Sequence, residues 1–347
     1  MIALISMLRS ERANIHVTRM QPEGGKTMRS MFMVCSALLL VSAGCATLPV
    51  FVPPAGVAVI AHRGASHDAP ENTLAAFRLA RDMGADWFEL DCHLSRDGLV
   101  VVSHDNELER TTGAQGTITE SDYAYLQSLD AGAWKGVQFA GERLPLFSEC
   151  LDFAKNSIGV YVEIKNEADD TALMGQILKE AEPYPVMTPE FATWMIRAIE
   201  ANGTRNLELT RKTIALIRER GMAQQVVIQS FSPIICAIAK IEAPEMRVEA
   251  LSGVKLDEHD IWELVTRWLF LLDLDGLNLS HESVTPGRMA TVKQSGKTVA
   301  VWTVDEKPIM DRVVGLGADA IITNRPDVAL SALGRRSVLA VIDLAVQ

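Results

Sequence analysis

Aromatic residues, cysteines and positive charge are all scarce in this 347-residue chain, and each shortage excludes a class of protein. Only 6% of the residues are aromatic and five are cysteine, which excludes a small disulfide-stapled fold. With 48% hydrophobic and 22% charged residues, the composition is that of a globular protein and not of a disordered or collagen-like chain. A core of this size needs no structural metal, so any metal is expected to serve chemistry.

Basic residues are too few for binding to nucleic acid. Residues 1–44 carry five Lys/Arg and two Asp/Glu, which leaves 28 basic and 42 acidic residues in the remainder. Binding to a phosphate backbone needs basic patches, and anionic membranes attract basic segments. We therefore expect no nucleic-acid partner and no electrostatic attraction of the body to a membrane.

A short apolar run near the start has the pattern of a secretory signal peptide. Met28-Arg29-Ser30 precedes the apolar residues 31–41, and Ser42-Ala43-Gly44-Cys45 follows. The run is too short to span a bilayer as a helix, and a basic start with small residues at the end is typical of export signals. No other stretch of the chain is long and apolar enough to span a membrane.

The leader is similar to bacterial lipoprotein signals, in which a lipidated cysteine becomes the mature N-terminus. We expect residues 1–45 to be a leader, with the signal at 28–45 and the lipid on Cys45, although Ser42 stands where such signals usually have Leu. Plain secretion with cleavage nearby remains the alternative, and either Met1 or Met28 could be the start. The mature protein would then lie in the periplasm or cell envelope, with its membrane contact limited to the lipid anchor.

Three cysteines remain in the body, Cys92, Cys150 and Cys236, at no metal-like spacing. One disulfide is possible in an oxidising compartment, but buried free thiols are the simpler interpretation.

Residues 46–56 are expected to be an extended, Pro-containing tether, and residues 57–330 a single α/β domain. In this domain, apolar β-rich runs alternate with helical patterns, and no Gly-x-Gly-x-x-Gly follows the first run. This alternation favours a TIM-type (β/α)8 barrel over a dinucleotide-binding sheet. Nine strands are predicted for eight places, so one of the last three is expected to be peripheral: Val57–Ala61, Trp87–Asp91, Leu99–Ser103, Gly159–Ile164, Val226–Gln229, Arg247–Leu251, Gly276–Leu279, Thr298–Thr303 and Ala320–Thr323.

Two segments are longer than a barrel needs, and one helix is unusually apolar. Residues 105–145 are predicted to be an insertion after the third strand, with a helical patch at 120–129. In residues 180–203, the prolines are predicted to break any long helix. Helices are predicted at 72–83, 205–220 and 261–272. The last of these is predicted to pack on the barrel, with membrane contact as the alternative.

Polar residues follow four consecutive predicted strands, where a parallel barrel places its active site. His62-Arg63 follows the first strand, Glu89 and Asp91 end the second, His104 follows the third, and Glu163 and Lys165 end the fourth. Residues two apart in a strand share a face. If both pairs face the lumen, three carboxylates meet there, and such a group requires a cation. Oxygen ligands suit one Mg²⁺ or Ca²⁺ ion.

The other side chains at these strand ends suit chemistry on phosphate. Histidines titrate near neutral pH and serve as acid and base, and Arg63 and Lys165 offer positive charge to an anionic oxygen. Only residues 92–98 join the second and third strands. A tight hairpin there is predicted to place His104 at the end of the barrel opposite to Asp91. A site that contains both residues is therefore predicted to require that residues 92–98 run back along the strand in an extended form, without a helix.

Over residues 57–327 the sequence resembles the glycerophosphodiester phosphodiesterases. The motifs that carry this resemblance are His62-Arg63-Gly64, Pro70-Glu71-Asn72-Thr73, Glu89-Leu90-Asp91, Asp97-Gly98, His104-Asp105, Arg110-Thr111-Thr112-Gly113, Glu163-Ile164-Lys165, Ser230-Phe231, Trp302-Thr303 and Thr323-Asn324-Arg325-Pro326. The resemblance implies a TIM-type barrel that hydrolyses glycerophosphodiesters to glycerol 3-phosphate and an alcohol with Mg²⁺ or Ca²⁺. It implies His62 and His104 as the acid/base pair, Glu89, Asp91 and Glu163 as metal ligands, Arg63 and Lys165 as phosphate-binding residues, Trp302 on the glycerol side and Glu71 as support.

Several roles and functions stay open at this point. Asp105 is expected either to orient His104 or to bond a loop backbone, Asn72 could simply cap its helix, and His67, His93, His259 and His281 are predicted to be surface or loop residues. The alternatives to a glycerophosphodiesterase are a lysophospholipase D or phospholipase C-like lipid hydrolase, which would need an apolar approach to the site, and a non-catalytic phosphodiester-binding lipoprotein. The head group and the oligomeric state are not predicted.

Overall fold

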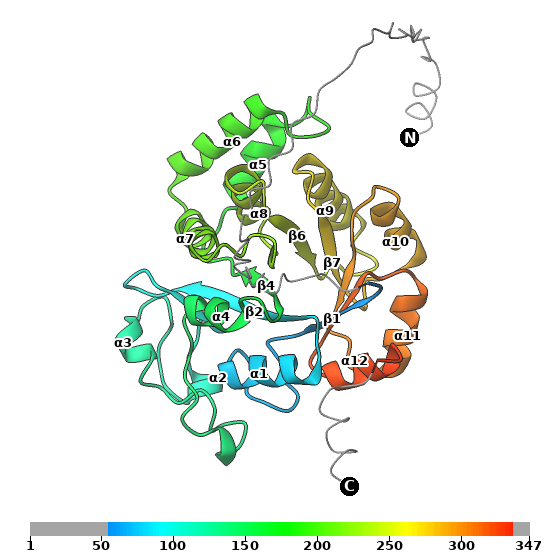
Figure 1. Cartoon of the computed structure of the whole chain (residues 1–347). Helices are drawn as coiled ribbons and strands as arrows, with labels where there is room; N and C mark the ends of the chain where they lie inside the picture. The colour runs from blue at the N-terminus through cyan, green and yellow to red at the C-terminus, as the bar shows by residue number, and fades with distance from the viewer. Residues whose placement is uncertain (1–54, 336–347) are drawn as a thin grey trace, which may run out of the picture. The chain divides into compact units, whose positions relative to one another are not determined.

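The computed structural model describes residues 55–335, so the predicted leader and all but the last two residues of the tether lie outside the described part. Eight parallel strands close into a barrel in the order β1, β9, β8, β7, β6, β5, β4, β2, with β2 also paired to β1. Figure 1 shows these strands at the centre with helices around them. The strands are β1 Ala58–Ala61, β2 Trp87–Leu94, β3 Val100–Val102, β4 Gly159–Ile164, β5 Val226–Ser230, β6 Arg247–Ser252, β7 Gly276–Ser280, β8 Ala300–Trp302 and β9 Ala320–Thr323.

The predicted barrel is confirmed, but the surplus strand was assigned wrongly. The strand outside the ring is β3, which pairs antiparallel with the far end of β2, and not one of the last three. β2 is long enough to extend beyond its parallel pairing with β4, and its extension carries the hairpin. An apolar run in a sequence does not reveal its direction, so the pattern could not separate β3 from the barrel strands.

Capping residues set where a helix begins and ends, as α1 illustrates. Thr73 caps α1, since its side chain accepts from the Ala76 N–H, and Gly84 ends that helix with φ 94°. The helices are α1 Leu74–Met83, α2 Glu109–Thr112, α3 Tyr123–Leu126, the 3₁₀ turn η1 Val137–Phe139, α4 Phe147–Ala154, α5 Thr171–Glu180, α6 Pro189–Asn202, α7 Arg205–Glu219, α8 Pro233–Glu242, α9 His259–Leu271, α10 Pro286–Lys293, α11 Lys307–Gly315 and α12 Pro326–Ala332.

One helix prediction was wrong, and another was too long. Between residues 180 and 203 a long helix does form, because Pro189 is the first residue of the 14-residue helix α6 and does not interrupt it. The helical patch predicted at 120–129 is a single turn, α3. The segment 105–145 otherwise folds on a small cluster of its own, in which Leu108, Ile118 and Leu126 are buried with Val101 of β3.

Alternation along the strands gives the barrel lumen its layers. In β2, Phe88, Leu90 and Cys92 pack against the surrounding helices, so Trp87 and the residues two and four further on face inward. Trp87 and Tyr161 belong to an apolar layer inside the barrel. The carboxylates of β2 and β4 therefore lie next to an apolar layer of the lumen, on the side nearer the carboxyl-terminal ends of the strands.

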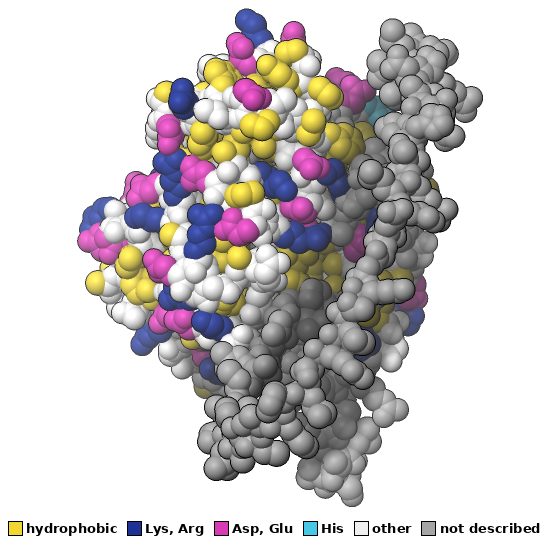
Figure 2. All heavy atoms as spheres, turned by 45° about the horizontal axis from the view of Figure 1, so that its top comes forward, with side chains coloured by type: hydrophobic (Ala, Val, Ile, Leu, Met, Phe, Trp, Pro, Cys, Tyr) yellow, Lys and Arg dark blue, Asp and Glu magenta, His cyan; other side chains and the backbone are white. Residues whose placement is uncertain are grey.

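Charges of both signs are interspersed on the face shown in Figure 2, with hydrophobic side chains between them. The described side chains in view there form no continuous basic stripe of the kind that a nucleic-acid backbone requires. Among residues 55–335, no helix combines the length and the apolar character needed to cross a bilayer. Cys92, Cys150 and Cys236 are buried free thiols, as predicted.

Candidate active site

A pocket of about 280 Å³ opens at the carboxyl-terminal end of the barrel strands, and most of the predicted site residues line it. Its volume is just below the range typical of small-molecule sites. Asp91 and Glu71 are not among the lining residues, but both pair with Arg63, which is. The lining residues are His62, Arg63, Glu89, His104, Glu163, Lys165, Gln229, Phe231, Leu251, Trp302, Thr303 and Ile322.

The turn after β1 places His62 and Arg63. Arg63 adopts φ 55° and Gly64 φ 81°, which is a left-handed turn that strongly favours glycine at the second position. A Cβ on Gly64 would lie 2.6 Å from atoms of Ala76 in α1. The turn aims the Arg63 N–H at the Glu89 Oε2, 2.9 Å away.

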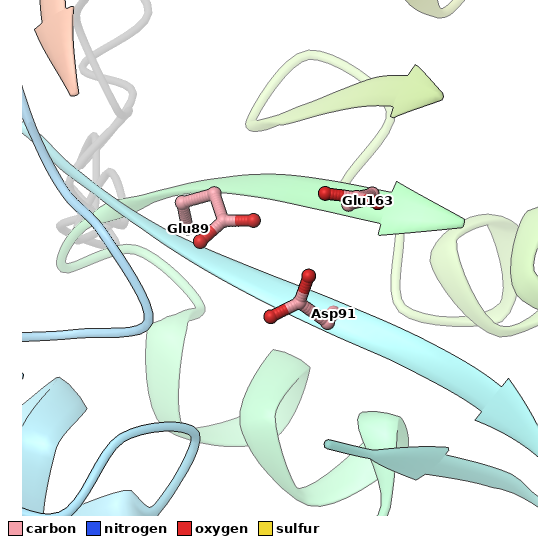
Figure 3. A group of neighbouring side chains, drawn as sticks. All are labelled: Glu89, Asp91 and Glu163. Carbon is pink, nitrogen blue, oxygen red and sulfur yellow. The ribbon is translucent and has the colours of Figure 1, made fainter. Parts of the chain in front are cut away.

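Three carboxylates converge from two neighbouring strands. Asp91 and Glu163 are register partners in β2 and β4, and oxygens of Glu89, Asp91 and Glu163 lie within 4.8 Å of one another. Figure 3 shows the three side chains turned toward a common space. All three residues are buried. A buried set of hard oxygen ligands is chemically suited to Mg²⁺ or Ca²⁺.

The charges in this group are strongly perturbed. Burial, and then repulsion from Asp91, raises the pKa of Glu163 to about 7. Burial and the neighbouring Asp91 and Glu163 carboxylates raise the pKa of Glu89 well above its usual value. Although burial opposes it, the Lys165 and Arg63 cations hold the pKa of Asp91 low. Two cations against three carboxylates leave an excess of negative charge, which a divalent ion would neutralise.

Lys165 and Arg63 contact these carboxylates directly. The Lys165 Nζ lies 2.8 Å from Glu163 Oε1 and 3.3 Å from Asp91 Oδ1, and the Arg63 Nε lies 3.5 Å from Asp91 Oδ2. The Arg63 Nε is buried and makes no hydrogen bond within the described residues. Both cations also line the pocket and can face an anionic ligand.

His62 is oriented by a neutral amide. Its Nδ1 lies 2.7 Å from Asn324 Oδ1, while the Asn324 Nδ2 donates to Asp305 Oδ2 at 2.7 Å. Because the amide nitrogen is committed to a carboxylate, the amide oxygen faces the ring and Nδ1 carries the proton. Burial, and then the Arg63 charge, lowers the pKa of His62 to about 4. His62 is therefore neutral, and its Nε2 carries a lone pair that can accept a proton.

His104 is oriented by a carboxylate. Its Nδ1 lies 2.7 Å from Asp105 Oδ1, so of the two alternatives for Asp105, orientation of the histidine is the one observed. Arg110 bonds Asp105 and also donates to both oxygens of Glu71 at 2.8 Å. Burial is the largest influence on the pKa of His104 and lowers it. Glu71 in turn accepts from Arg63 at 3.0 Å, so one ionic chain links His104 to Arg63.

The hairpin prediction for His104 was wrong. β2 and β3 do form an antiparallel hairpin, but β2 runs past the site before the chain turns back, and the Ser103 N–H returns to bond the Asp91 carbonyl at 3.0 Å. His104 therefore lies level with Asp91 and not at the opposite end.

His93 was also predicted wrongly, since it is a buried residue of β2. Its Nδ1 lies 3.1 Å from Glu167 Oε1 and its Nε2 lies 3.2 Å from the His104 carbonyl, so it holds the backbone that carries His104. Asn72 is not the cap of α1, since Thr73 is; it adopts φ 57° and donates to Asp91 Oδ2 at 2.8 Å. Alternation from Glu89 and Asp91 predicts an inward His93, whereas nothing in the spacing identifies Glu167 or Asp305.

The fold is a parallel barrel, and at the carboxyl-terminal ends of its strands two histidines lie near three buried carboxylates that could hold a cation. The chain belongs to the glycerophosphoryl diester phosphodiesterase family, whose model matches residues 62–182 and 192–328. It is therefore an enzyme of the phosphodiesterase class.

Individual relatives agree with this family. The chain is 31% identical over 274 residues to the glycerophosphodiester phosphodiesterase of Caldanaerobacter subterraneus subsp. tengcongensis, covering 79% of this chain and 96% of that protein. A phosphodiesterase of Oleispira antarctica, solved with its product sn-glycerol 3-phosphate, matches with a TM-score of 0.59 at 25% identity, over 80% of this chain and 97% of that one. The glycerophosphodiester phosphodiesterase of Agrobacterium tumefaciens matches with a TM-score of 0.59 at 26% identity, over 79% of this chain and 99% of that one.

Proposed function

We propose that this protein hydrolyses glycerophosphodiesters to glycerol 3-phosphate and an alcohol, with a bound divalent cation and with His62 and His104 as base and acid. The observation that carries this proposal is one pocket with two histidines whose Nδ1 atoms have different partners, an amide for His62 and a carboxylate for His104. Family membership supports the same chemistry.

His62 is suited to accept a proton. Its Nδ1–H is held by Asn324, so the free Nε2 can take the proton of the attacking water as the water oxygen bonds to phosphorus. A pKa lowered to about 4 keeps this nitrogen unprotonated at neutral pH.

His104 is suited to donate a proton. The Asp105 carboxylate stabilises its protonated ring, from which Nε2 can deliver a proton to the alcohol oxygen as its bond to phosphorus breaks. Water thus adds across one ester bond, and the two products are a phosphate monoester and an alcohol.

Arg63 and Lys165 would hold the phosphate, and Trp302 the glycerol. Both cationic side chains line the pocket, so their N–H groups can bond phosphate oxygens. The Trp302 indole is anchored by its Nε1–H to the Asn278 carbonyl at 3.0 Å and lines the pocket as a flat wall.

Glu89, Asp91 and Glu163 would hold one Mg²⁺ or Ca²⁺ ion. Bound there, the cation would supply electrostatic stabilisation of the negative charge on the phosphoryl oxygens. The three carboxylates fit this use because they are buried, adjacent and rich in negative charge.

The leader supports a proposal about location. We infer that the protein is exported and held to the membrane only through lipid on Cys45, with plain secretion as the alternative. The residues concerned lie outside the described part of the chain.

The decisive experiment is product analysis with histidine variants. Glycerophosphocholine, glycerophosphoethanolamine and glycerophosphoglycerol are incubated with the purified protein and Mg²⁺ or Ca²⁺, and glycerol 3-phosphate is measured. His62→Ala and His104→Ala should each lose about 10²–10⁴-fold in rate while keeping a cooperative melt, because both side chains lie at the pocket and outside the apolar core.

His259→Ala is the matched control, because this histidine is exposed at the start of α9, and its rate should equal that of the wild type. Near-normal turnover in either active-site variant would refute the assigned roles. Binding without turnover of any of the compounds would instead favour a phosphodiester-binding protein.

A further inference from the structure

Two neutral amides lie buried inside the barrel near the three carboxylates. They are Gln229 of β5 and Asn278 of β7. The lumen of a parallel barrel is normally filled by branched apolar side chains, and burying an amide costs stability unless the amide is hydrogen-bonded. Amides at these positions therefore indicate a use in the site, and Gln229 is among the residues that line the active-site pocket.

The Gln229 amide is held in one orientation by its two partners. Its Nε2 lies 3.4 Å from Glu89 Oε1, and its Oε1 accepts from the Asn278 Nδ2 at 2.8 Å. A carboxylate accepts hydrogen bonds, so the nitrogen of the amide faces Glu89 and the oxygen faces Asn278. Gln229 thus turns its NH₂ group toward the carboxylates of the site.

This NH₂ group has donor capacity to spare. An amide nitrogen carries two hydrogens, and among residues 55–335 the Gln229 Nε2 bonds only Glu89. At 3.4 Å, that bond is longer than an ordinary N–H···O bond. Because Gln229 lines the pocket, an oxygen of a bound ligand can accept from its Nε2.

The position beside Glu89 favours a hydroxyl as that acceptor. An anionic phosphate oxygen next to the Glu89 carboxylate would be repelled by it. A hydroxyl is neutral, and it both accepts and donates hydrogen bonds. It can therefore accept from Gln229 without a charge conflict.

Asn278 also holds the aromatic wall of the pocket. Its main-chain carbonyl accepts from the Trp302 Nε1–H at 3.0 Å, while its side chain holds the Gln229 oxygen. Gln229 and Trp302 are thus tied to one residue of β7. Under the proposed function Trp302 faces the glycerol of the substrate, so the glycerol is the part that lies near Gln229.

We propose that Gln229 binds the substrate by donating its Nε2–H to a hydroxyl oxygen of the glycerol, and that Asn278 is the positioning residue that turns the amide for this task. The inference rests on the proposed function and deepens it. A diester of an alcohol that lacks this hydroxyl leaves the donor without its acceptor, so Gln229 makes the enzyme selective for glycerol.

The test combines deoxygenated substrates with a variant of similar side-chain length. Glycerophosphocholine is compared with 3-hydroxypropyl and 2-hydroxypropyl phosphocholine, which lack the secondary and the terminal glycerol hydroxyl, and choline release is measured. Gln229→Met removes both N–H groups. The wild type should have a lower kcat/KM for at least one analogue, and this discrimination should shrink by about 3- to 10-fold in Gln229→Met, as expected for one neutral hydrogen bond.

Two further variants separate positioning from a general structural effect. Asn278→Leu removes the side chain that holds the Gln229 oxygen but keeps the main-chain carbonyl that holds Trp302. It should shrink the same discrimination and keep a cooperative melt. Gln294→Met is the matched control, because this glutamine is exposed at the end of α10, and it should keep the wild-type discrimination.

A wild type that hydrolyses both analogues as fast as glycerophosphocholine would overturn the proposal, whether or not the variants fold. So would an equal loss of kcat/KM on all three substrates in Gln229→Met, because that result indicates support of Glu89 alone.

Calorimetric titration with glycerol 3-phosphate, 3-hydroxypropyl phosphate and 2-hydroxypropyl phosphate adds a readout that needs no turnover. If no diester is hydrolysed, the proposed function fails. The Gln229 contact then stands if the affinity difference between these ligands shrinks in Gln229→Met, and it falls if that difference is unchanged.

Discussion

At the scale of single residues, the two histidines differ in what holds them. Asp305 accepts from the Asn324 backbone N–H at 2.8 Å and from its Nδ2 at 2.7 Å, which fixes the amide that faces His62. Asp105, by contrast, places a full negative charge on His104. An amide adds no charge to the ring, whereas a carboxylate favours its protonated form. The Asp105 carboxylate therefore offsets part of the lowering of the His104 pKa that burial causes.

The pH profile of activity should reflect this arrangement. His62 must be unprotonated to accept a proton, and its pKa is lowered to about 4. With the carboxylates kept ionised by saturating cation, the fraction of His62 able to accept a proton falls as the pH drops through about 4, whereas an unperturbed histidine would be lost near 6.5. Measured at saturating cation, kcat/KM should stay near its plateau at pH 5.5. An acid limb centred at 6.5 would contradict the assignment of His62 as base.

At the scale of elements, the proposed cation site is a product of strand register. Glu89 and Asp91 share one face of β2, and pairing places Asp91 beside Glu163 of β4. Removal of one ligand should therefore weaken cation binding without disturbing the strands, since the main-chain pairing does not depend on the carboxylates.

Cation binding should be visible as a gain in stability. Mg²⁺ or Ca²⁺ at about 100 times its Kd should stabilise the wild-type fold by about 2.7 kcal/mol, measured as a rise in Tm, and chelation should stop turnover. Asp91→Asn should lose most of both effects, while Glu180→Gln, a change at the exposed end of α5, should keep them. Full activity in a sample that elemental analysis finds free of metal would refute a catalytic cation.

The turn that carries His62 should tolerate no side chain at Gly64. Gly64→Ala places a Cβ in a left-handed conformation and against α1, whereas Gly296→Ala, at φ 78°, meets only open space. In urea unfolding, Gly296→Ala should cost about 1–2 kcal/mol, and Gly64→Ala about 1–3 kcal/mol more from overpacking. Equal losses would show that the α1 contact relaxes freely.

Sequence alone was sufficient for the barrel and for the residues at its strand ends, because both follow from alternation and from the order of elements. It failed where the outcome depends on distant partners. His93 pairs with Glu167 across 74 positions, and no local pattern encodes that contact. Pro189 was predicted to break a helix and instead begins one, because the same residue is unfavourable inside a helix and favourable at its first position.

At the scale of the whole molecule, the two ends of the barrel differ in kind. A larger cavity of about 440 Å³ lies at the end where the strands begin, near Ala58 and Val226. Its charged side chains include Arg247 and Glu249, paired at 2.7 Å, and no histidine lines it among the described residues. Of the two ends of the barrel, this one has the larger cavity, but the two histidines and the cluster of three carboxylates lie at the other, as expected for a parallel barrel.

The last prediction concerns how the whole protein is held in the cell. If residues 28–45 are a lipoprotein signal, mass spectrometry of the mature protein from a bacterial host should find an N-terminal Cys45 that carries lipid. Cys45→Ser should abolish the modification, whereas Cys35→Ser, a change within the apolar run of the same leader, should not. A chain anchored in this way would keep a barrel with no expected membrane affinity of its own close to lipid-derived phosphodiesters. An unmodified N-terminus downstream of Cys45 would establish plain secretion instead, and the enzyme would then meet its substrates by diffusion.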